Sequence, residues 1–308
     1  MPHHPFLSVV IPAHNAALTL GRALESVFLQ DYEPLEVIVV DDGSIDGTAD
    51  LARAFADRHV QVLRLDHCGG AAHARNHGVK ASHGDLIAFL DADDEWMGGK
   101  LAKQVALLAA NPGMTLVSCG SNLIAPDGRD CGPLYPGRPP SSGGQAWRVL
   151  LAYNFIATPS VVVRRTALEA VGVFDTSLKV GEDQDMWIRL AVAGEIGYVD
   201  DVLVRVHETP NSLSSGNFQD QLVYTLPMIR RHLERQGGDL TPREIRSILG
   251  NRLGRLGRSA LGRGLQREGA SLILRAMLLG YRPFENALLL LRATLWTGWF
   301  RRVLSRRR

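Results

Sequence analysis

The chain has 308 residues, which is enough for one large domain with an appendage or for two domains. Its hydrophobic fraction of 45% and charged fraction of 21% exclude a fibrous or disordered protein. The net charge of +2 hides an asymmetry, because residues 228–308 hold 18 Lys and Arg against 5 Asp and Glu, or +13, while residues 1–227 hold 16 against 27, or −11.

Short apolar runs alternate with amphipathic segments over the first third of the chain. The runs predict strands at residues 7–11, 35–40, 60–65 and 86–90. Because the last run has no polar alternation, both faces of that strand should be covered. Helices are expected in the intervals between the strands. This alternation predicts an α/β fold with a doubly wound parallel sheet, whose ligands bind at the carboxyl ends of the strands.

The loop after the first predicted strand excludes two common nucleotide-binding motifs. Pro12-Ala13-His14-Asn15 stands where a dinucleotide-binding fold carries GxGxxG, and the phosphate loop GxxxxGK[ST] does not occur in the chain. A nucleotide bound at this edge would therefore need a different set of contacts.

Four acids follow the strand at residues 86–90 within five positions: Asp91, Asp93, Asp94 and Glu95. Like charges at the end of a buried strand repel one another, and a divalent cation is the usual remedy because hard cations prefer carboxylate oxygen. The same run is also typical of a solvated acidic loop or of a helix N-terminus, where Asp favours the helix dipole.

Four segments of this chain together resemble glycosyltransferase family 2, whose members are inverting enzymes of the GT-A fold that use nucleotide-diphosphate sugars. They are SVVIPAHN at 8–15, VVDDGSIDGT at 39–48, ARNHG at 74–78 and FLDADD at 89–94. A sparser similarity continues to about residue 220 and includes GEDQDMW at 181–187. The resemblance implies a GT-A domain over residues 1–220, with a Rossmann-like mixed sheet and helices on both faces. A basic helical region would follow over residues 221–308.

The resemblance also assigns a set of residues to the nucleotide-sugar donor: Pro12, Ala13, Asn15, Asp41, Asp42, Arg75, Asp91 and Ala92. A carboxylate at Asp42 can accept the imide N–H of uracil, which favours a UDP-sugar. Taken alone, residues 41–44 are equally typical of an Asx turn. Arg75 also fits an arginine on a helix surface.

Metal ligands are likewise implied by the resemblance. It assigns a divalent cation, Mn²⁺ or Mg²⁺, to Asp93 with Asp91, since both ions prefer hard oxygen ligands. His207 would complete the coordination, although a structural histidine bonded to the backbone fits this position as well.

The resemblance places the catalytic base at Asp183, with Glu182 beside it. Neighbouring carboxylates raise one another's pKa and favour a proton acceptor near neutral pH. These acids also suit the start of a helix through residues 186–190, with Glu182 or Asp183 as the N-cap, and both roles are compatible. Trp187 is either a core residue or a sugar platform.

The basic C-terminal region reads as helical. Residues 286–308 mix leucine and tryptophan with arginine, which predicts either an amphipathic helix on an anionic membrane or a helix packed on its own domain. Nucleic acid is not expected as a partner, since this segment lacks lysine and its aromatics do not line a groove. No signal peptide or membrane-spanning run is expected, and the three cysteines have no metal or CxxC spacing. We therefore expect a cytoplasmic protein, peripheral on the inner face of the cytoplasmic membrane.

These features predict an inverting glycosyltransferase for cell-envelope polysaccharide, which moves a sugar to an acceptor hydroxyl of a glycan or lipid-linked precursor. A sugar-phosphate nucleotidyltransferase is a second candidate, but it would need a glycine-rich loop with Lys or Arg after the first strand. A non-catalytic module that binds a nucleotide sugar or a glycan is a third, but it would not need the acids at 182–183 in addition to Asp91 and Asp93.

Overall fold

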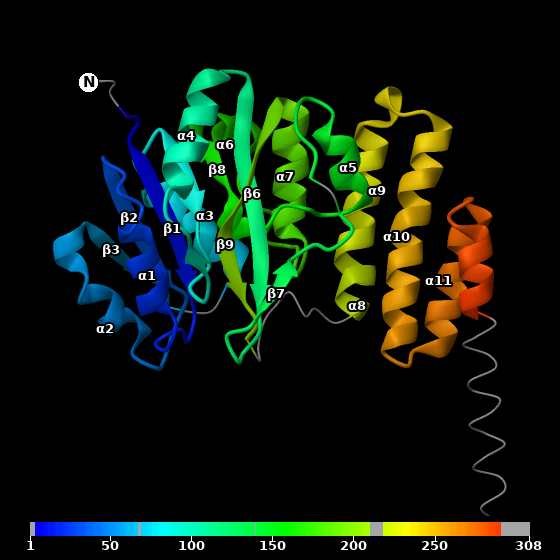
Figure 1. Ribbon diagram of the computed structural model, residues 1–308, viewed down its shortest axis with the longest axis horizontal. Helices are drawn as coiled ribbons and strands as arrows, with labels where there is room; N and C mark the ends of the chain where they lie inside the picture. Colours follow the sequence, from blue (N-terminus) through cyan, green and yellow to red (C-terminus); the bar gives the residue numbers. More distant parts are fainter. Residues whose placement is uncertain (1–3, 67–68, 139, 210–217, 291–308) are drawn as a thin grey trace, which may run out of the picture. The chain divides into compact units, whose positions relative to one another are not determined.

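The structure is a computed structural model that describes residues 4–66, 69–138, 140–209 and 218–290 (Figure 1). The chain divides into two compact units. The first comprises residues 1–150 with 154–215, and the second comprises residues 151–153 with 216–308. The assignment of a catalytic domain to residues 1–220 stays a proposal.

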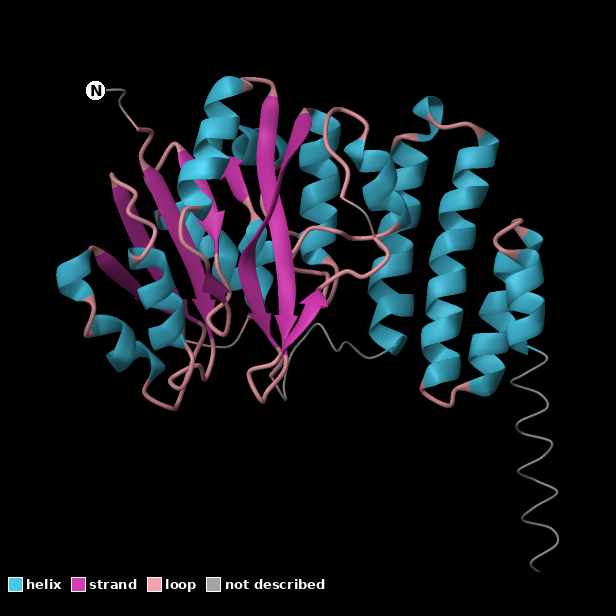
Figure 2. Cartoon of the chain, in the orientation of Figure 1, coloured by secondary structure: helices cyan, strands magenta, loops and turns pink. Residues whose placement is uncertain are grey.

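One mixed sheet runs through the described part of the first unit (Figure 2). Its strands lie in the order β3-β2-β1-β4-β8-β6-β9-β5, with β7 paired to β6. Their bounds are β1 (Leu7–Ala13), β2 (Leu35–Asp41), β3 (Val60–Arg64), β4 (Leu86–Phe89), β5 (Glu95–Trp96), β6 (Met114–Ile124), β7 (Asp130–Pro133), β8 (Val162–Arg164) and β9 (Glu195–His207).

The first four strands form the parallel half that the sequence predicts, since β1 pairs in parallel with β2 and β4, and β2 with β3. Strand β8 is antiparallel to both β4 and β6, whereas β6 and β9 are parallel. The sheet is therefore mixed, as the GT-A resemblance implies.

Helices cover both faces of this sheet (Figure 1). Those of the first unit are α1 (Leu20–Phe28), α2 (Thr48–Arg53), α3 (Ala71–Ala81), α4 (Lys100–Ala110), α6 (Arg165–Val171) and α7 (Glu182–Ala193), with 3₁₀ turns at Ala56–Arg58 and Thr158–Ser160. Helix α5 (Ala146–Ala152) begins in the first unit, and its last two residues are assigned to the second. Successive strand residues point to opposite faces. Val37 and Val39 pack in one core with α1 and α4, whereas Ile38 and Val40 pack with Ala74 of α3. The predicted α/β fold is confirmed.

The second unit is helical in its described part. It contains α8 (Phe218–Asp220), a π-helical turn (Gln221–Thr225), α9 (Leu226–Arg235), a 3₁₀ turn (Gly237–Asp239), α10 (Pro242–Gly262) and α11 (Gln266–Leu278). Small residues let α10 and α11 approach closely: a Cβ added at Gly257 would lie 2.8 Å from Ile273 Cγ1. Among the described helices, none has the length and apolarity needed to cross a membrane. Residues 291–308, which hold most of the predicted amphipathic helix, lie outside the described residues.

Candidate active site

The loops after β1 and β2 are tied together at the carboxyl edge of the sheet. Asn15 makes two of the hydrogen bonds between these loops. Its N–H donates to Ser44 Oγ at 2.9 Å, and its Oδ1 accepts the N–H of Ile45 at 3.0 Å. Ala13, at the end of β1, accepts the N–H of Asp42 through its carbonyl at 2.8 Å. Pro12 lies half-buried in the same strand. These residues shape the edge where parallel α/β sheets bind ligands.

Asp41 and Asp42 are both buried and hydrogen-bonded. Asp41 accepts the N–H of Ser44 at 3.0 Å, as in an Asx turn. The two oxygens of Asp42 accept the N–H groups of Gly69 and Gly70 at 3.0 and 2.8 Å, so this carboxylate fixes the approach to α3.

Arg75 on α3 joins two acidic segments that are far apart in the sequence. Its Nη2 lies 2.8 Å from Asp91 Oδ1, and its Nη1 lies 3.0 Å from Glu182 Oε1. The side chain is 5% exposed, so it is a buried cation rather than the surface arginine that the sequence also allowed. Burial alone would lower the pKa of Arg75, but the carboxylates of Asp91 and Glu182 raise it. The guanidinium therefore stays charged and holds both acids in one site.

Asp183 lies in the first turn of α7, beside Glu182. Its Oδ2 accepts the amide N–H of Asn154 at 3.0 Å, and its Oδ1 accepts the main-chain N–H of Gln184 at 2.6 Å. Burial, and then the charge of Glu182, raise the pKa of Asp183 to about 7. A carboxylate with this pKa takes up a proton near neutral pH, as a general base must. The N-cap of α7 is Gly181, at φ 84°, so neither acid caps the helix.

Asp91, Asp93 and Asp94, which follow β4, repel one another, and nearby positive groups do not fully compensate their negative charge. Burial, and then Asp91, raise the pKa of Asp93; burial, Asp91 and Asp93 raise that of Asp94 well above its ordinary value. Thr209 donates to Asp93 Oδ2 at 3.2 Å, and the main-chain N–H of His207 donates to Asp94 Oδ1 at 2.9 Å. A divalent cation would relieve this repulsion, so the donor set fits a hard metal ion.

His207 stands at the end of β9, next to this acidic loop. Its Nε2 lies 3.6 Å from Glu95 Oε1, and burial, followed by the charge of Arg22, lowers its pKa. A neutral imidazole is the form that binds metals. In the part of the chain that the structure describes, no three His, Cys, Asp or Glu side chains gather closely enough to hold a cation. A cation here would need further oxygen ligands, such as those of a bound diphosphate.

Trp187 and Ala92, which the sequence alone allowed to contact a sugar or the nucleotide sugar, both lie in the core. Trp187 is fully buried, with its ring 6.3 Å from that of Phe89 and 6.1 Å from that of Phe174, so it is a core residue and not a sugar platform. Ala92 is also buried in the main core.

Asn154 and Arg22 belong to the site but carry no sequence signal. Asn154 lies in a segment without a family motif, and Arg22, on the polar side of α1, donates to the carbonyl of Asp93 at 2.5 Å. Neither residue stands at a spacing that would reveal a role.

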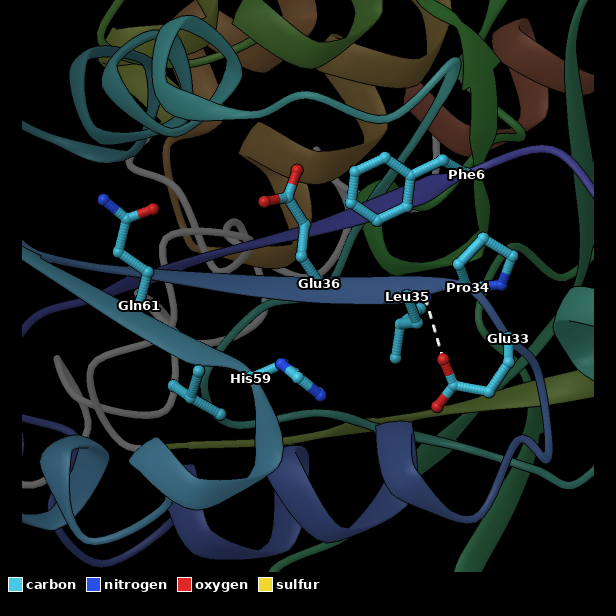
Figure 3. Close-up of a pocket in the computed structure, with 8 residues that line it drawn as sticks. Phe6, Glu33, Pro34, Leu35, Glu36, His59 and Gln61 are labelled. Carbon is cyan, nitrogen blue, oxygen red and sulfur yellow. Dashed lines mark hydrogen bonds between the residues drawn. The ribbon is translucent and has the colours of Figure 1, made fainter.

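An open cavity of about 520 Å³ lies at the opposite edge of the sheet (Figure 3). Phe6, Leu35 and Val60 line it at the amino ends of β1, β2 and β3. Because these strands are parallel, the acids at their carboxyl ends lie at the other edge. The cavity is not part of the candidate active site.

Comparisons with known proteins identify the family. The model described as glycosyl transferase family 2 matches residues 8–143. Residues 8–143 of the chain therefore belong to glycosyltransferase family 2. It is a transferase enzyme, as its named relatives are. WfaP of Escherichia coli, named as a UDP-Glc:α-D-GlcNAc-diphosphoundecaprenol β-1,3-glucosyltransferase, is 29% identical over 217 residues, which cover 70% of this chain and 82% of WfaP.

Solved glycosyltransferases share the fold of this enzyme. The crystal structure of S. aureus TarS residues 1–349 matches with a TM-score of 0.61 at 19% identity, covering 89% of this chain and 80% of that one. The mannosyltransferase PcManGT of Pyrobaculum calidifontis, in complex with GDP-Man and Mn²⁺, matches with a TM-score of 0.58 at 21% identity, covering 96% and 86%. These likenesses support the GT-A architecture.

Proposed function

We propose that this glycosyltransferase inverts the sugar it transfers, moving it from a nucleoside diphosphate sugar to an acceptor hydroxyl of a glycan or lipid-linked precursor. The observation that carries the proposal is the buried Arg75, which contacts Asp91 at 2.8 Å and Glu182 at 3.0 Å. Through this one cation the acids after β4 and the acids at the start of α7 face a common site.

In the proposed reaction, Asp183 takes the proton of the acceptor hydroxyl as its oxygen attacks the anomeric carbon. The bond from that carbon to the diphosphate oxygen breaks, and its electron pair leaves with the nucleoside diphosphate. Asp93, Asp91 and His207 would hold Mn²⁺ or Mg²⁺, which when bound supplies charge stabilisation to the leaving diphosphate. The nucleotide would lie along Pro12, Ala13, Asn15, Asp41, Asp42, Arg75 and Ala92.

A uracil nucleotide is the preferred donor in this proposal. WfaP carries UDP-Glc and a diphosphoundecaprenol acceptor in its name, which supports a UDP-sugar and a lipid-linked acceptor. The carboxylate of Asp42 suits the imide N–H of uracil, a donor that cytosine lacks. PcManGT was solved with GDP-Man, so a test has to include guanine nucleotides.

The test is donor hydrolysis in the absence of acceptor. UDP-, GDP- and dTDP-sugars are each incubated with the enzyme in Mn²⁺ or in EDTA, and the released nucleoside diphosphate is measured. We expect slow hydrolysis of a UDP-sugar that stops in EDTA, because the leaving diphosphate then loses its charge stabilisation. Equal rates with and without metal would contradict the metal's role, and failure of every nucleotide sugar to react would contradict the proposed donor class.

The enzyme is further proposed to rest on an anionic membrane, at the inner face of the cytoplasmic membrane, through its second unit. Support comes from exposed apolar side chains on α11 and the helix at residues 283–290, where Leu278 and Phe284 are each 86% exposed. Arg275 and Arg282 lie exposed among them. Apolar side chains mixed with arginine favour the interface of an anionic bilayer, at about 1 kcal/mol for each basic residue near the surface.

Vesicle sedimentation tests this membrane proposal. We expect the full chain to bind vesicles of anionic phosphatidylglycerol and to dissociate from them in high salt. It should not bind vesicles of neutral phosphatidylcholine. The double variant Leu278→Glu with Phe284→Glu should bind at least about tenfold less, since charge is costly at the interface. Leu29→Glu, at an exposed site of the first unit, is the control. Equal binding by the double variant would exclude this surface, and a chain ending before Asn286 that binds undiminished would exclude the tail.

A further inference from the structure

Asn154 is held in one orientation by three contacts. Its side-chain Oδ1 accepts the main-chain N–H of Ile156 at 3.1 Å, and its main-chain carbonyl accepts a bond from Arg138 Nη1 at 3.3 Å. The amide group is planar, so fixing the oxygen also fixes the nitrogen. That nitrogen donates to Asp183 Oδ2 at 3.0 Å. The donor is thus locked toward the carboxylate before any substrate binds.

The carboxylate that receives this bond is surrounded mainly by groups that oppose its charge. Burial, and then Glu182 and Asp91, raise the pKa of Asp183, while the N–H of Gln184 and the guanidinium of Arg75 lower it. Tyr135 is close enough to feel this charge, since burial and then Asp183 raise the pKa of Tyr135.

Arg138 stacks on the ring of that tyrosine at 5.3 Å, so its guanidinium is turned to the ring and to the carbonyl of Asn154. The only side-chain amide that donates to Asp183 among the described residues is that of Asn154.

Each oxygen of the Asp183 carboxylate accepts one N–H, so the carboxylate can still accept a hydrogen bond from an acceptor hydroxyl. Gln184 occupies one position on Oδ1 and Asn154 occupies one on Oδ2, and each carboxylate oxygen has two lone pairs. Hydrogen bonds to an ionised carboxylate stabilise that form against the neutral acid. The Asn154 amide can therefore orient the carboxylate and keep it ionised without blocking an incoming hydroxyl.

We propose that Asn154 is a positioning residue for the proton transfer, holding the Asp183 carboxylate ionised and turned toward the acceptor hydroxyl. The inference rests on the proposed role of Asp183 as the base. A purely structural role is the rival: the amide would then serve only to bond Ile156 and shape the loop.

Two variants separate these roles. Asn154→Ala removes both the donor and the bond to Ile156. Asn154→Asp keeps the acceptor for Ile156 but replaces the donor with a third carboxylate near Asp183. The new carboxylate raises the pKa of Asp183 whatever the role of the amide, so Asn154→Ala decides between the roles. A structural role predicts that Asn154→Ala loses stability with an unmoved pH profile, whereas a positioning role predicts that its profile shifts and that Asn154→Asp is the more impaired of the two.

The measurement is the pH dependence of kcat and of the donor KM for each variant. We expect the acidic limb of kcat to move up by about one pH unit in Asn154→Ala and further in Asn154→Asp. At pH 6.5, kcat should fall by roughly tenfold or more, because less of the base is ionised. The donor KM should stay within about twofold of wild type, since Asn154 is assigned no contact with the nucleotide.

Asn122→Ala is a matched control. Asn122 also donates its amide to a carboxylate, that of Asp130, at 3.1 and 2.9 Å, but on the exposed pairing of β6 with β7. This variant should leave the acidic limb where it is. An unmoved limb in the folded Asn154→Ala protein would overturn the inference.

Failure of this inference differs from failure of the proposed function. If Asp183→Asn keeps its turnover, Asp183 is not the base and the proposed function itself is wrong. If Asp183→Asn is inactive but Asn154→Ala keeps the wild-type pH profile, only the positioning role is excluded.

Discussion

Replacing Asp183 with Asn should lower turnover by roughly two to four decades, with donor affinity little changed. The amide keeps the size of the carboxylate but cannot take up the hydroxyl proton, and its nitrogen can no longer accept one of the two bonds from Asn154 and Gln184. The carboxylate sits beside Glu182 with a pKa raised to about 7, first by burial and then by that neighbour. The measurement is kcat for transfer, together with the affinity for UDP, in both proteins.

The proposed role of Asp183 also predicts the direction in which turnover changes with pH. The base is active when ionised, so wild-type turnover should rise with pH through about 7 and level off above it. The residual turnover of Asp183→Asn should lack this limb. Asp185→Asn is the control on the same helical turn, because its carboxylate bonds Arg189 at 2.8 Å. It should lower stability but reduce turnover no more than a few-fold, and an equal loss in both variants would contradict the role of Asp183.

The second large effect is expected from Asp93→Asn. Without this negative charge, Mn²⁺ should no longer strengthen UDP binding, a loss of roughly tenfold or more in metal-dependent affinity. The metal-free protein should not be destabilised, because burial and Asp91 raise the pKa of Asp93, which means that its ionised form lowers the stability of the folded state above the ordinary pKa of an aspartate.

Calorimetry with UDP, with and without Mn²⁺, measures this effect, and thermal melting without metal checks stability. Asp201→Asn is the control, since its carboxylate pairs with Lys103 at 2.8 Å and is half exposed. A Mn²⁺ effect as large in Asp93→Asn as in wild type would remove Asp93 from the metal site. A strong loss of thermal stability would point to a structural carboxylate instead.

The parallel half of the sheet was predictable because its signals are local. Each of β1, β2, β3 and β4 is a short apolar run followed by turn residues, and neighbours in sequence are joined by single helices. The rest of the sheet depends on distant pairings, such as the antiparallel pair of Leu116 with Val163 and the parallel pair of Cys119 with Val199. Hydrophobic patterning does not encode such pairings, and only the resemblance to family 2 pointed to a mixed sheet.

The site was predictable as a set of acids but not as a set of contacts. Asp91 and Glu182 stand in recognisable motifs, yet nothing in either motif indicates that Arg75 contacts both. Its guanidinium was assigned to the nucleotide from sequence, and that assignment stays a prediction beside the ion pairs of the structure. Asn154 shows the same limit, because a single asparagine outside any motif gains its meaning only from the 3.0 Å bond to Asp183.

We propose that the acids after β4 bind the metal and that those at the start of α7 supply the base. The most direct test measures Mn²⁺-dependent UDP affinity and turnover on the same preparations of Asp93→Asn and Asp183→Asn. We predict that Asp93→Asn loses the metal-dependent affinity, while Asp183→Asn keeps that affinity and loses only turnover. Two outcomes would contradict the proposal that Asp93 binds the metal while Asp183 acts as the base on the same sugar. They are a loss of metal-dependent UDP affinity in Asp183→Asn, or unchanged turnover in that variant.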